Sequence, residues 1–270
     1  MQWLIKFFNG YIKYNFHVSI AVWALAQITT SDFGISLPLK DQMIFLAAPF
    51  LAYNFIKLPP SVFDKVPQTS SNFILIAFVL LSFLLLIMTV FFLPIESQLI
   101  LFLTLVLVML YCLPLPGFKI NFRGLKGMKI HLVAMSWTLT AVFLPLSIAG
   151  ENLTFLSCVY AFQRYLFVVV ATLPFEIRDL KSDDPNLSTW PQKWGIKRTK
   201  IIGIAMLFVF FGIEFFYTIS SHLSSTLVAV FVLSMLLLYS KTEQSKYFSS
   251  FWVESIPILW LFLRGLNLVI

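Results

Sequence analysis

The sequence has little charge. Only 11% of its 270 residues are Asp, Glu, Lys or Arg, whereas 59% are hydrophobic, and the mean hydropathy is +0.89. About a quarter of the residues of a soluble globular protein are charged, so the composition excludes that class. Because only helices and closed barrels satisfy their backbone in lipid, and the apolar runs are long, we expect an all-α polytopic membrane protein embedded in the lipid bilayer.

Cysteine and the motifs of well-known catalytic sites are also scarce. The two cysteines, Cys112 and Cys158, fall near opposite faces of the membrane in this reading, which excludes a disulfide between them. The sequence contains no Cys/His spacing of a transition-metal site, no phosphate-binding glycine loop and no nucleophile elbow. It also lacks an internal repeat strong enough to indicate an inverted-repeat transporter.

Long apolar runs, in contrast, fill most of the chain. A helix needs about twenty residues to cross roughly 30 Å of hydrocarbon, somewhat fewer at the shorter end. Nine runs approach this length: 17–30, 43–57, 73–92, 98–113, 130–148, 153–175, 201–219, 223–239 and 251–268. The aromatic stretch from Trp3 to Phe16 is amphipathic and could lie along the membrane interface. We therefore expect about nine membrane-spanning helices in a single domain, residues 1–270.

The distribution of Lys and Arg predicts the orientation. Most of the 19 basic residues lie in the N-terminal stretch and in the loops after the second, fourth, sixth and eighth runs. Loops rich in Lys and Arg stay in the cytoplasm, so these loops and the N-terminus are expected there, and the C-terminus outside. The same bias accounts for the net charge of +7 without nucleic-acid binding.

Three acidic residues follow the sixth run. Glu176, Asp179 and Asp183 are spaced i, i+3 and i+7, which places them on one face of a helix. Converging carboxylates repel one another unless a cation neutralises them, and hard oxygen ligands of this kind suit Mg²⁺. A cation held there could bridge to a diphosphate. The alternative is that these are solvated charges of a cytoplasmic loop.

Basic residues near this segment provide a candidate anion site. Lys197 and Arg198 form a cluster of the sort that contacts phosphate oxygens. Lys126 and Lys129, in a glycine-containing loop, could complete it. All four equally satisfy the positive-inside rule, so a purely topological role stays open.

The segment RDLKSD, residues 178–183, resembles the second aspartate-rich motif, DxxxD, of the UbiA superfamily of intramembrane prenyltransferases. Its position after the sixth run is also that of the family motif. The resemblance implies a UbiA-type bundle in which Asp179 and Asp183 hold Mg²⁺ on a prenyl diphosphate. It further implies that Glu176 is a neighbouring acidic position and that Lys197 and Arg198 approach the diphosphate.

The first motif of that family, NDxxD, is degenerate in this chain. The corresponding segment is Asn54-Phe55-Ile56-Lys57-Leu58, which keeps the leading Asn and has apolar residues at both aspartate positions. Lys57 could contact the diphosphate in place of a metal ion, as a point charge. Alternatively, Asn54 and Lys57 simply end a helix at the membrane interface.

The sixth and seventh runs each carry a charged residue at membrane depth, Arg164 and Glu214. Charges at that depth need partners, so we expect a salt bridge between them. The functional alternative is that Arg164 lines a cavity and orients a polar acceptor.

The resemblance to the UbiA superfamily implies Mg²⁺-dependent transfer of an isoprenyl group from a prenyl diphosphate to an aromatic or other lipophilic acceptor, and this is the function that we expect. Aromatic side chains would stabilise the allyl cation by cation–π contact. The alternatives are a non-catalytic UbiA-type protein that binds an isoprenoid or a partner protein, and an unrelated small transporter, which no positive feature supports.

Overall fold

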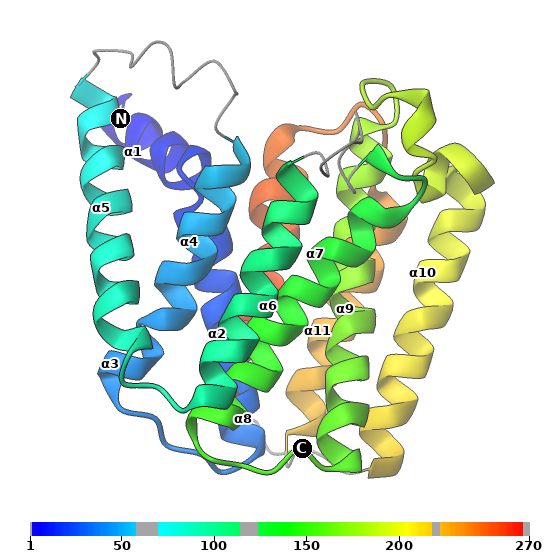
Figure 1. The fold of residues 1–270 in the computed structure, drawn as a ribbon. Helices are drawn as coiled ribbons and strands as arrows, with labels where there is room; N and C mark the ends of the chain where they lie inside the picture. Colours follow the sequence, from blue (N-terminus) through cyan, green and yellow to red (C-terminus); the bar gives the residue numbers. More distant parts are fainter. Residues whose placement is uncertain (1, 58–69, 114–123, 218–221, 267–270) are drawn as a thin grey trace.

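The computed structural model describes residues 2–57, 70–113, 124–217 and 222–266, and within these ranges it contains helices, turns and loops but no β-strand (Figure 1). The α-helices are α1 (Gln2–Lys13), α2 (Phe16–Asp32), α3 (Leu39–Gln42), α4 (Ile44–Lys57), α5 (Ser70–Val90), α6 (Ile95–Cys112), α7 (Met128–Thr138), α8 (Leu144–Ile148), α9 (Phe155–Asp179), α10 (Trp190–Tyr217), α11 (Leu223–Tyr239) and α12 (Ile256–Gly265). The expected all-α architecture is confirmed.

The predicted count of nine membrane-spanning helices is not confirmed. Among the described residues, four helices are long and apolar enough to cross a membrane: Ile95–Cys112, Met128–Ile148, Phe155–Asp179 and Trp190–Phe216. The apolar helices Leu75–Val90 and Leu223–Tyr239 are shorter. Many large apolar side chains point outward from the bundle, Phe92, Phe208 and Phe216 among them. These properties are those of an integral membrane protein.

Helix α9 packs against α7, α10 and α11 and carries much of the core. Phe167 of α9 stacks near Phe210 of α10 and Trp260 of α12, with ring centroids 5.9 and 5.5 Å away. Helix α10 approaches closely because Gly203 has no side chain. A Cβ atom at that position would lie 2.7 Å from Leu173 and 2.6 Å from Leu237. The close packing fixes α9 rigidly between its neighbours.

The N-terminal helix α1 is separate from α2, as its amphipathic sequence suggested, and lies across the upper end of the bundle in Figure 1. Asn15, with a φ of 65°, makes the turn between the two helices. The outer face of α1 exposes apolar side chains such as Trp3 and Phe7. Phe8 of α1 packs against the bundle, with its ring centroid 5.0 Å from that of Phe251.

Two wide π-helical turns interrupt the helices, at Leu139–Phe143 between α7 and α8 and at Phe248–Val253 before α12. In the first, the Thr29 hydroxyl of α2 donates a hydrogen bond of 2.7 Å to the Ala141 carbonyl. In the second, the Glu254 N–H bonds to the Ser249 carbonyl at 3.3 Å, five residues back. Such turns rotate the residues that follow them relative to a regular helix.

The helix that carries the acidic motif is shorter than the i, i+3, i+7 pattern predicted. Helix α9 ends at Asp179, so Asp183 lies beyond it. The Asp183 N–H still bonds to the Asp179 carbonyl at 2.8 Å, which keeps one further turn compact. Polar Ser182 and Asp184, followed by Pro185, offer the chain turn conformations that compete with the helix.

Candidate functional site

A cavity of about 240 Å³ lies between α4, α6, α7, α9 and the start of α12. Its charged lining residues are Lys129, Glu176, Asp179 and Glu254. Its aromatic lining residues are Tyr53, Tyr111, Trp137, Phe167 and Phe175. Glu176 and Asp179 belong to the last turn of α9, and Lys129 to the first turn of α7, so the charges gather at one end of the bundle.

A second, smaller cavity of about 90 Å³ adjoins the first, since both are lined by Tyr53, Tyr111, Val133 and Trp137. The Trp137 indole N–H donates to the Tyr53 hydroxyl at 2.8 Å in this shared wall. The smaller cavity carries no charged residue; its walls are mostly aliphatic. The two spaces together offer charged groups at one end and apolar walls at the other, which fits a molecule with an anionic head and an apolar tail.

The three acidic residues of the predicted face are each held by another group. The Asp179 carboxylate receives two hydrogen bonds from Arg178, of 2.7 and 3.0 Å. Asp183 forms an ion pair of 2.9 Å with Lys129. The Glu176 carboxylate accepts a hydrogen bond of 3.2 Å from the backbone N–H of Trp190. Glu176 and Asp179 line the cavity. Asp183 does not line it, but its ion-pair partner Lys129 does.

The predicted metal ligands do not form a ready-made ion site. Across the described ranges, no group of three His, Cys, Asp or Glu side chains is arranged to hold a metal ion. The donor chemistry nevertheless fits Mg²⁺, since Asp179 and Asp183 offer hard carboxylate oxygens beside a cavity. Binding of the ion at these residues requires that the contacts from Arg178 and Lys129 loosen.

Lys129 reaches Asp183 because two loops are joined. The Gly127 N–H bonds to the Leu187 carbonyl at 2.9 Å, which ties the start of α7 to the segment that follows α9. Gly127 has a φ of 75°, a left-handed conformation that glycine adopts without strain. The structure thus brings Lys129 and Asp183 together, as a shared site requires.

The remaining basic candidates lie elsewhere. Lys126, Lys197 and Arg198 are exposed, and none of them lines either cavity. The neighbouring Lys200 donates to the Leu238 and Ser240 carbonyls at 2.6 and 2.8 Å, where it caps the end of α11. Gly195, with a φ of 77°, kinks α10 just before this basic cluster.

Asn54 and Lys57 tie α4 to the turn between α1 and α2. The Asn54 amide donates to the Tyr14 and Phe50 carbonyls at 3.1 and 2.8 Å, and its oxygen accepts from Asn15 at 3.0 Å. The Lys57 ammonium group donates to the Asn15 side-chain oxygen. Neither residue lines the two cavities. The remainder of the loop after Lys57, including Asp64, lies outside the described residues.

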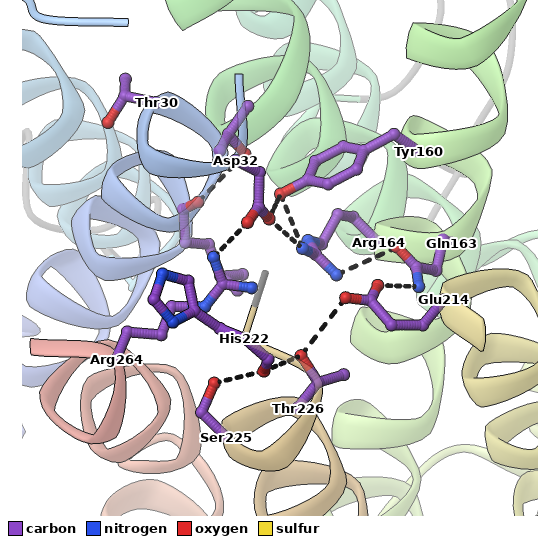
Figure 2. A network of polar contacts seen from close by, with 12 residues as sticks. Thr30, Asp32, Tyr160, Gln163, Arg164, Glu214, His222, Ser225, Thr226 and Arg264 are labelled. Carbon is purple, nitrogen blue, oxygen red and sulfur yellow. Dashed lines mark hydrogen bonds and ion pairs between the residues drawn. The ribbon is translucent and has the colours of Figure 1, made fainter. Parts of the chain in front are cut away.

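Arg164 belongs to a buried polar network at the other end of α9 (Figure 2). Its guanidinium group forms an ion pair of 3.1 Å with Asp32, and Asp32 also pairs with Arg264. The side chains of Asp32, Arg164 and Arg264 are 0%, 1% and 3% exposed. The Tyr160 hydroxyl donates to Asp32 at 2.7 Å. Arg164 therefore does not line the cavities.

The expected Arg164–Glu214 salt bridge needs correction. The ion-pair partner of Arg164 is Asp32, and Gln163 connects Arg164 to Glu214. The Gln163 amide donates to Glu214 at 2.7 Å, while its oxygen accepts from Arg164 at 3.2 Å. Aromatic rings of Tyr160 and Trp260 lie 4.2 and 4.5 Å from the Arg164 guanidinium and add cation–π stabilisation.

Sequence reasoning missed Asp32 and Glu254. Asp32 is the last residue of α2 and lies just beyond the first apolar run, so the sequence alone indicates a loop residue at this position. Glu254 lies within the last apolar run, and the rule that intramembrane charges need a partner or a function would have identified it.

Comparison with solved structures identifies the architecture. A UbiA homolog from Archaeoglobus fulgidus superposes with a TM-score of 0.58 at 14% sequence identity, covering 97% of this chain and 99% of that chain. The chain has the UbiA fold. The same comparison finds a UbiA homolog from that organism bound to DMAPP and Mg²⁺, with a TM-score of 0.56, 15% identity and coverage of 94% and 98%.

A third UbiA-fold neighbour, a homolog from the same organism bound to Cd²⁺, superposes with a TM-score of 0.55 at 14% identity and covers 96% of this chain and 100% of its own. No protein-family model matches the sequence, and no curated protein matches it. At these identities the UbiA fold follows from the likeness, and the chemistry must be argued from the cavity.

Proposed function

We propose that this UbiA-fold protein is a Mg²⁺-dependent intramembrane prenyltransferase that moves an isoprenyl group from a prenyl diphosphate to a lipophilic acceptor. The observation that carries the proposal is the cavity with Lys129, Glu176 and Asp179 at one end and aromatic walls beyond. The diphosphate would lie at the charged end and the prenyl chain along the apolar walls that continue into the smaller cavity.

The charges around the cavity account for a need for Mg²⁺. Three basic groups, Lys57, Lys129 and Arg178, face four carboxylates. These carboxylates are Glu176, Asp179, Asp183 and Glu254. These carboxylates would repel a diphosphate at close range. Bound Mg²⁺ would offset that repulsion and neutralise the leaving diphosphate.

Each residue then has a defined task. Asp179 and Asp183 would hold the ion, with Glu176 beside them as a further acidic group. Arg178 and Lys129, freed from these carboxylates, would turn to the phosphate oxygens. The rings of Tyr53, Trp137 and Phe167 would stabilise positive charge that develops on the prenyl carbon as its bond to the diphosphate breaks.

A second candidate function is non-catalytic binding of an isoprenoid or a partner protein. The observation in its favour is that Arg178 and Lys129 already neutralise Asp179 and Asp183 without a metal ion. Loss of both aspartates of the first motif points the same way. In this reading the cavity holds an uncharged isoprenoid, and Mg²⁺ has no effect on its binding.

We also infer that the charged end of the cavity faces the cytoplasm, because Lys129 at the start of α7 and Arg178 at the end of α9 lie there and belong to segments rich in Lys and Arg. Single-cysteine variants would be labelled in sealed vesicles to test this. A cysteine within 185–195 should react from the cytoplasmic side and one at position 151 from the outside. Labelling of both positions from the same side would contradict this orientation.

The activity is tested with purified protein in detergent, Mg²⁺, labelled prenyl diphosphates of several lengths and a panel of lipophilic acceptors. We expect diphosphate release that requires both Mg²⁺ and an acceptor. Isoprenoid binding that is tight, independent of Mg²⁺ and never followed by diphosphate release would favour the binding protein over the transferase.

A further inference from the structure

Glu254 differs from the other carboxylates at the cavity. In the parts of the chain that the structure describes, its side chain has neither a hydrogen bond nor an ion pair, although it lines the cavity wall. Glu176, Asp179 and Asp183 are each held by an N–H group or a basic side chain. Glu254 is therefore the described cavity carboxylate that is free to act on a bound molecule.

The inward position of Glu254 results from the break before α12. The π-helical turn Phe248–Val253 ends one residue before Glu254, and Pro257, which has no N–H, follows in the first turn of α12. Val253 and Pro257 line the same cavity. The turn thus places a charged side chain inside a segment that the sequence otherwise makes apolar, and wide turns of this kind are frequent at functional sites.

The surroundings of Glu254 are suited to an uncharged ligand. Its neighbours on the wall are aromatic and aliphatic, and the basic groups acting on it at longer range, Lys57 and Arg178, are bound to Asn15 and Asp179. A carboxylate without a partner on the cavity wall gains a hydrogen bond when a hydroxyl group of the ligand donates to it. An acceptor with its own carboxylate, unlike a diphosphate that Mg²⁺ neutralises, would be repelled by Glu254, Glu176 and Asp179 together.

We propose that Glu254 accepts the proton of the acceptor's hydroxyl group, and that the acceptor is an uncharged lipophilic phenol or alcohol and not an aromatic acid. This inference rests on the proposed prenyl transfer.

The O–H proton passes to a Glu254 carboxylate oxygen, and the electron pair it leaves makes the acceptor nucleophilic. A bond forms between the acceptor and C1 of the prenyl chain while the bond from C1 to the diphosphate oxygen breaks. The bonding pair leaves with the diphosphate, and Glu254 later releases its proton to water.

The test compares wild type, Glu254→Gln and Glu254→Asp, with Glu243→Gln as a matched control on the exposed surface. Acceptors are supplied in pairs that differ only by a carboxylate group. For wild type we expect turnover of the uncharged member of each pair. For Glu254→Gln we expect a loss of at least about 100-fold in kcat, since a positioned general base contributes 10²–10⁴-fold.

Three further readouts separate proton transfer from a structural role. The dissociation constant of a non-hydrolysable prenyl thiolodiphosphate should stay within about twofold in Glu254→Gln. Glu254→Asp should recover part of the kcat, because it restores the carboxylate. The discrimination against carboxylated acceptors should fall about tenfold in Glu254→Gln, since a like charge is removed.

Each other outcome contradicts a specific claim. An unchanged kcat in Glu254→Gln, or a change in KM alone, would overturn the base assignment while leaving prenyl transfer intact. A wild-type preference for carboxylated acceptors would overturn the acceptor class. Absence of diphosphate release by wild type with every pair would overturn the proposed function and the role of Glu254 with it.

Discussion

The two ends of α9 handle buried charge in opposite ways. At the N-terminal half, Asp32 binds Arg164 and Arg264 in a closed network with side chains at most 3% exposed (Figure 2). At the C-terminal end, roughly 22 Å away by helical rise from Arg164, the carboxylates face a cavity. There each ion pair is partly open, with 17% and 11% exposure for Lys129 and Asp183, and Glu254 has no partner among the described residues.

The difference shows how the same acidic and basic residue types can serve either stability or ligand binding. The buried Asp32 carboxylate accepts hydrogen bonds from Arg164, Arg264 and Tyr160, and it joins α2, α9 and α12. A charge that faces a cavity with one partner, or none, can exchange that partner for a ligand. We therefore expect substitutions in the network to change stability and substitutions at the cavity to change binding.

The largest effect is expected for Asp32→Asn. The substitution leaves two buried guanidinium groups without their carboxylate, and breaking a buried ion pair costs about 3–5 kcal/mol. The free energy of unfolding in detergent would be measured against Glu151→Gln, an exposed carboxylate. If Asp32→Asn costs less than about 1 kcal/mol, the network does not hold these helices together.

The second-largest effect, on ligand binding, is expected for Asp179→Asn. Loss of a charge-assisted metal ligand should weaken Mg²⁺-dependent binding of a prenyl diphosphate by tenfold or more, or about 1.5–3 kcal/mol. Stability should change little, because the Arg178–Asp179 pair is partly exposed. Asp184→Asn is the control, since Asn keeps the hydrogen bond that the Asp184 side chain accepts from the Asn186 N–H. Equal losses for both variants would indicate nonspecific loop electrostatics.

A smaller effect is expected for Lys57→Ala. Its ammonium group is bound to Asn15 and lies near Glu254, so it contributes to the local charge without lining the cavity. We expect affinity for the prenyl diphosphate to fall about threefold, as measured by titration calorimetry. A loss as large as that of Asp179→Asn would instead make Lys57 a direct contact of the diphosphate, in place of the lost first motif.

The smallest effect is expected for Glu243→Gln. The hydrogen bond from Lys181 holds the pKa of this exposed carboxylate below its ordinary value. The pair therefore adds stability only above the ordinary pKa of Glu, and that contribution is lost as the pH falls through the lowered pKa. Because both side chains are exposed, we expect wild type and variant to unfold at the same temperature within error at pH 7. A clear difference would show that surface pairs also hold this end together.

The sequence predicted the all-α membrane fold because long apolar runs admit few alternatives in lipid. The sequence also singled out Asp179 and Lys129, which stand near the ends of apolar segments, and in the structure both residues line the cavity. The partner of Arg164 could not be predicted, because 132 residues separate it from Asp32 and only packing brings them together.

Other differences from the sequence-based expectations have local causes. Asn54 matches a motif position, and in the structure its amide donates to the carbonyls of Tyr14 and Phe50, so its contact with a diphosphate stays a prediction. The prediction that Asp183 shares a helical face with Glu176 and Asp179 assumed a regular helix through Asp183, whereas the helix ends at Asp179. Glu254 is visible in the sequence as a charge within the last apolar run, but its position on the cavity wall depends on the π-helical turn, which a 3.6-residue period does not represent.

The proposed chemistry requires that the charged end of the cavity bind a prenyl diphosphate through Mg²⁺. Titration calorimetry of wild type, Asp179→Asn and Glu243→Gln with a non-hydrolysable prenyl thiolodiphosphate, with and without Mg²⁺, measures this binding. We expect binding that requires Mg²⁺, is at least tenfold weaker in Asp179→Asn and is unchanged in Glu243→Gln. Binding of equal strength in all three proteins without Mg²⁺ would contradict it.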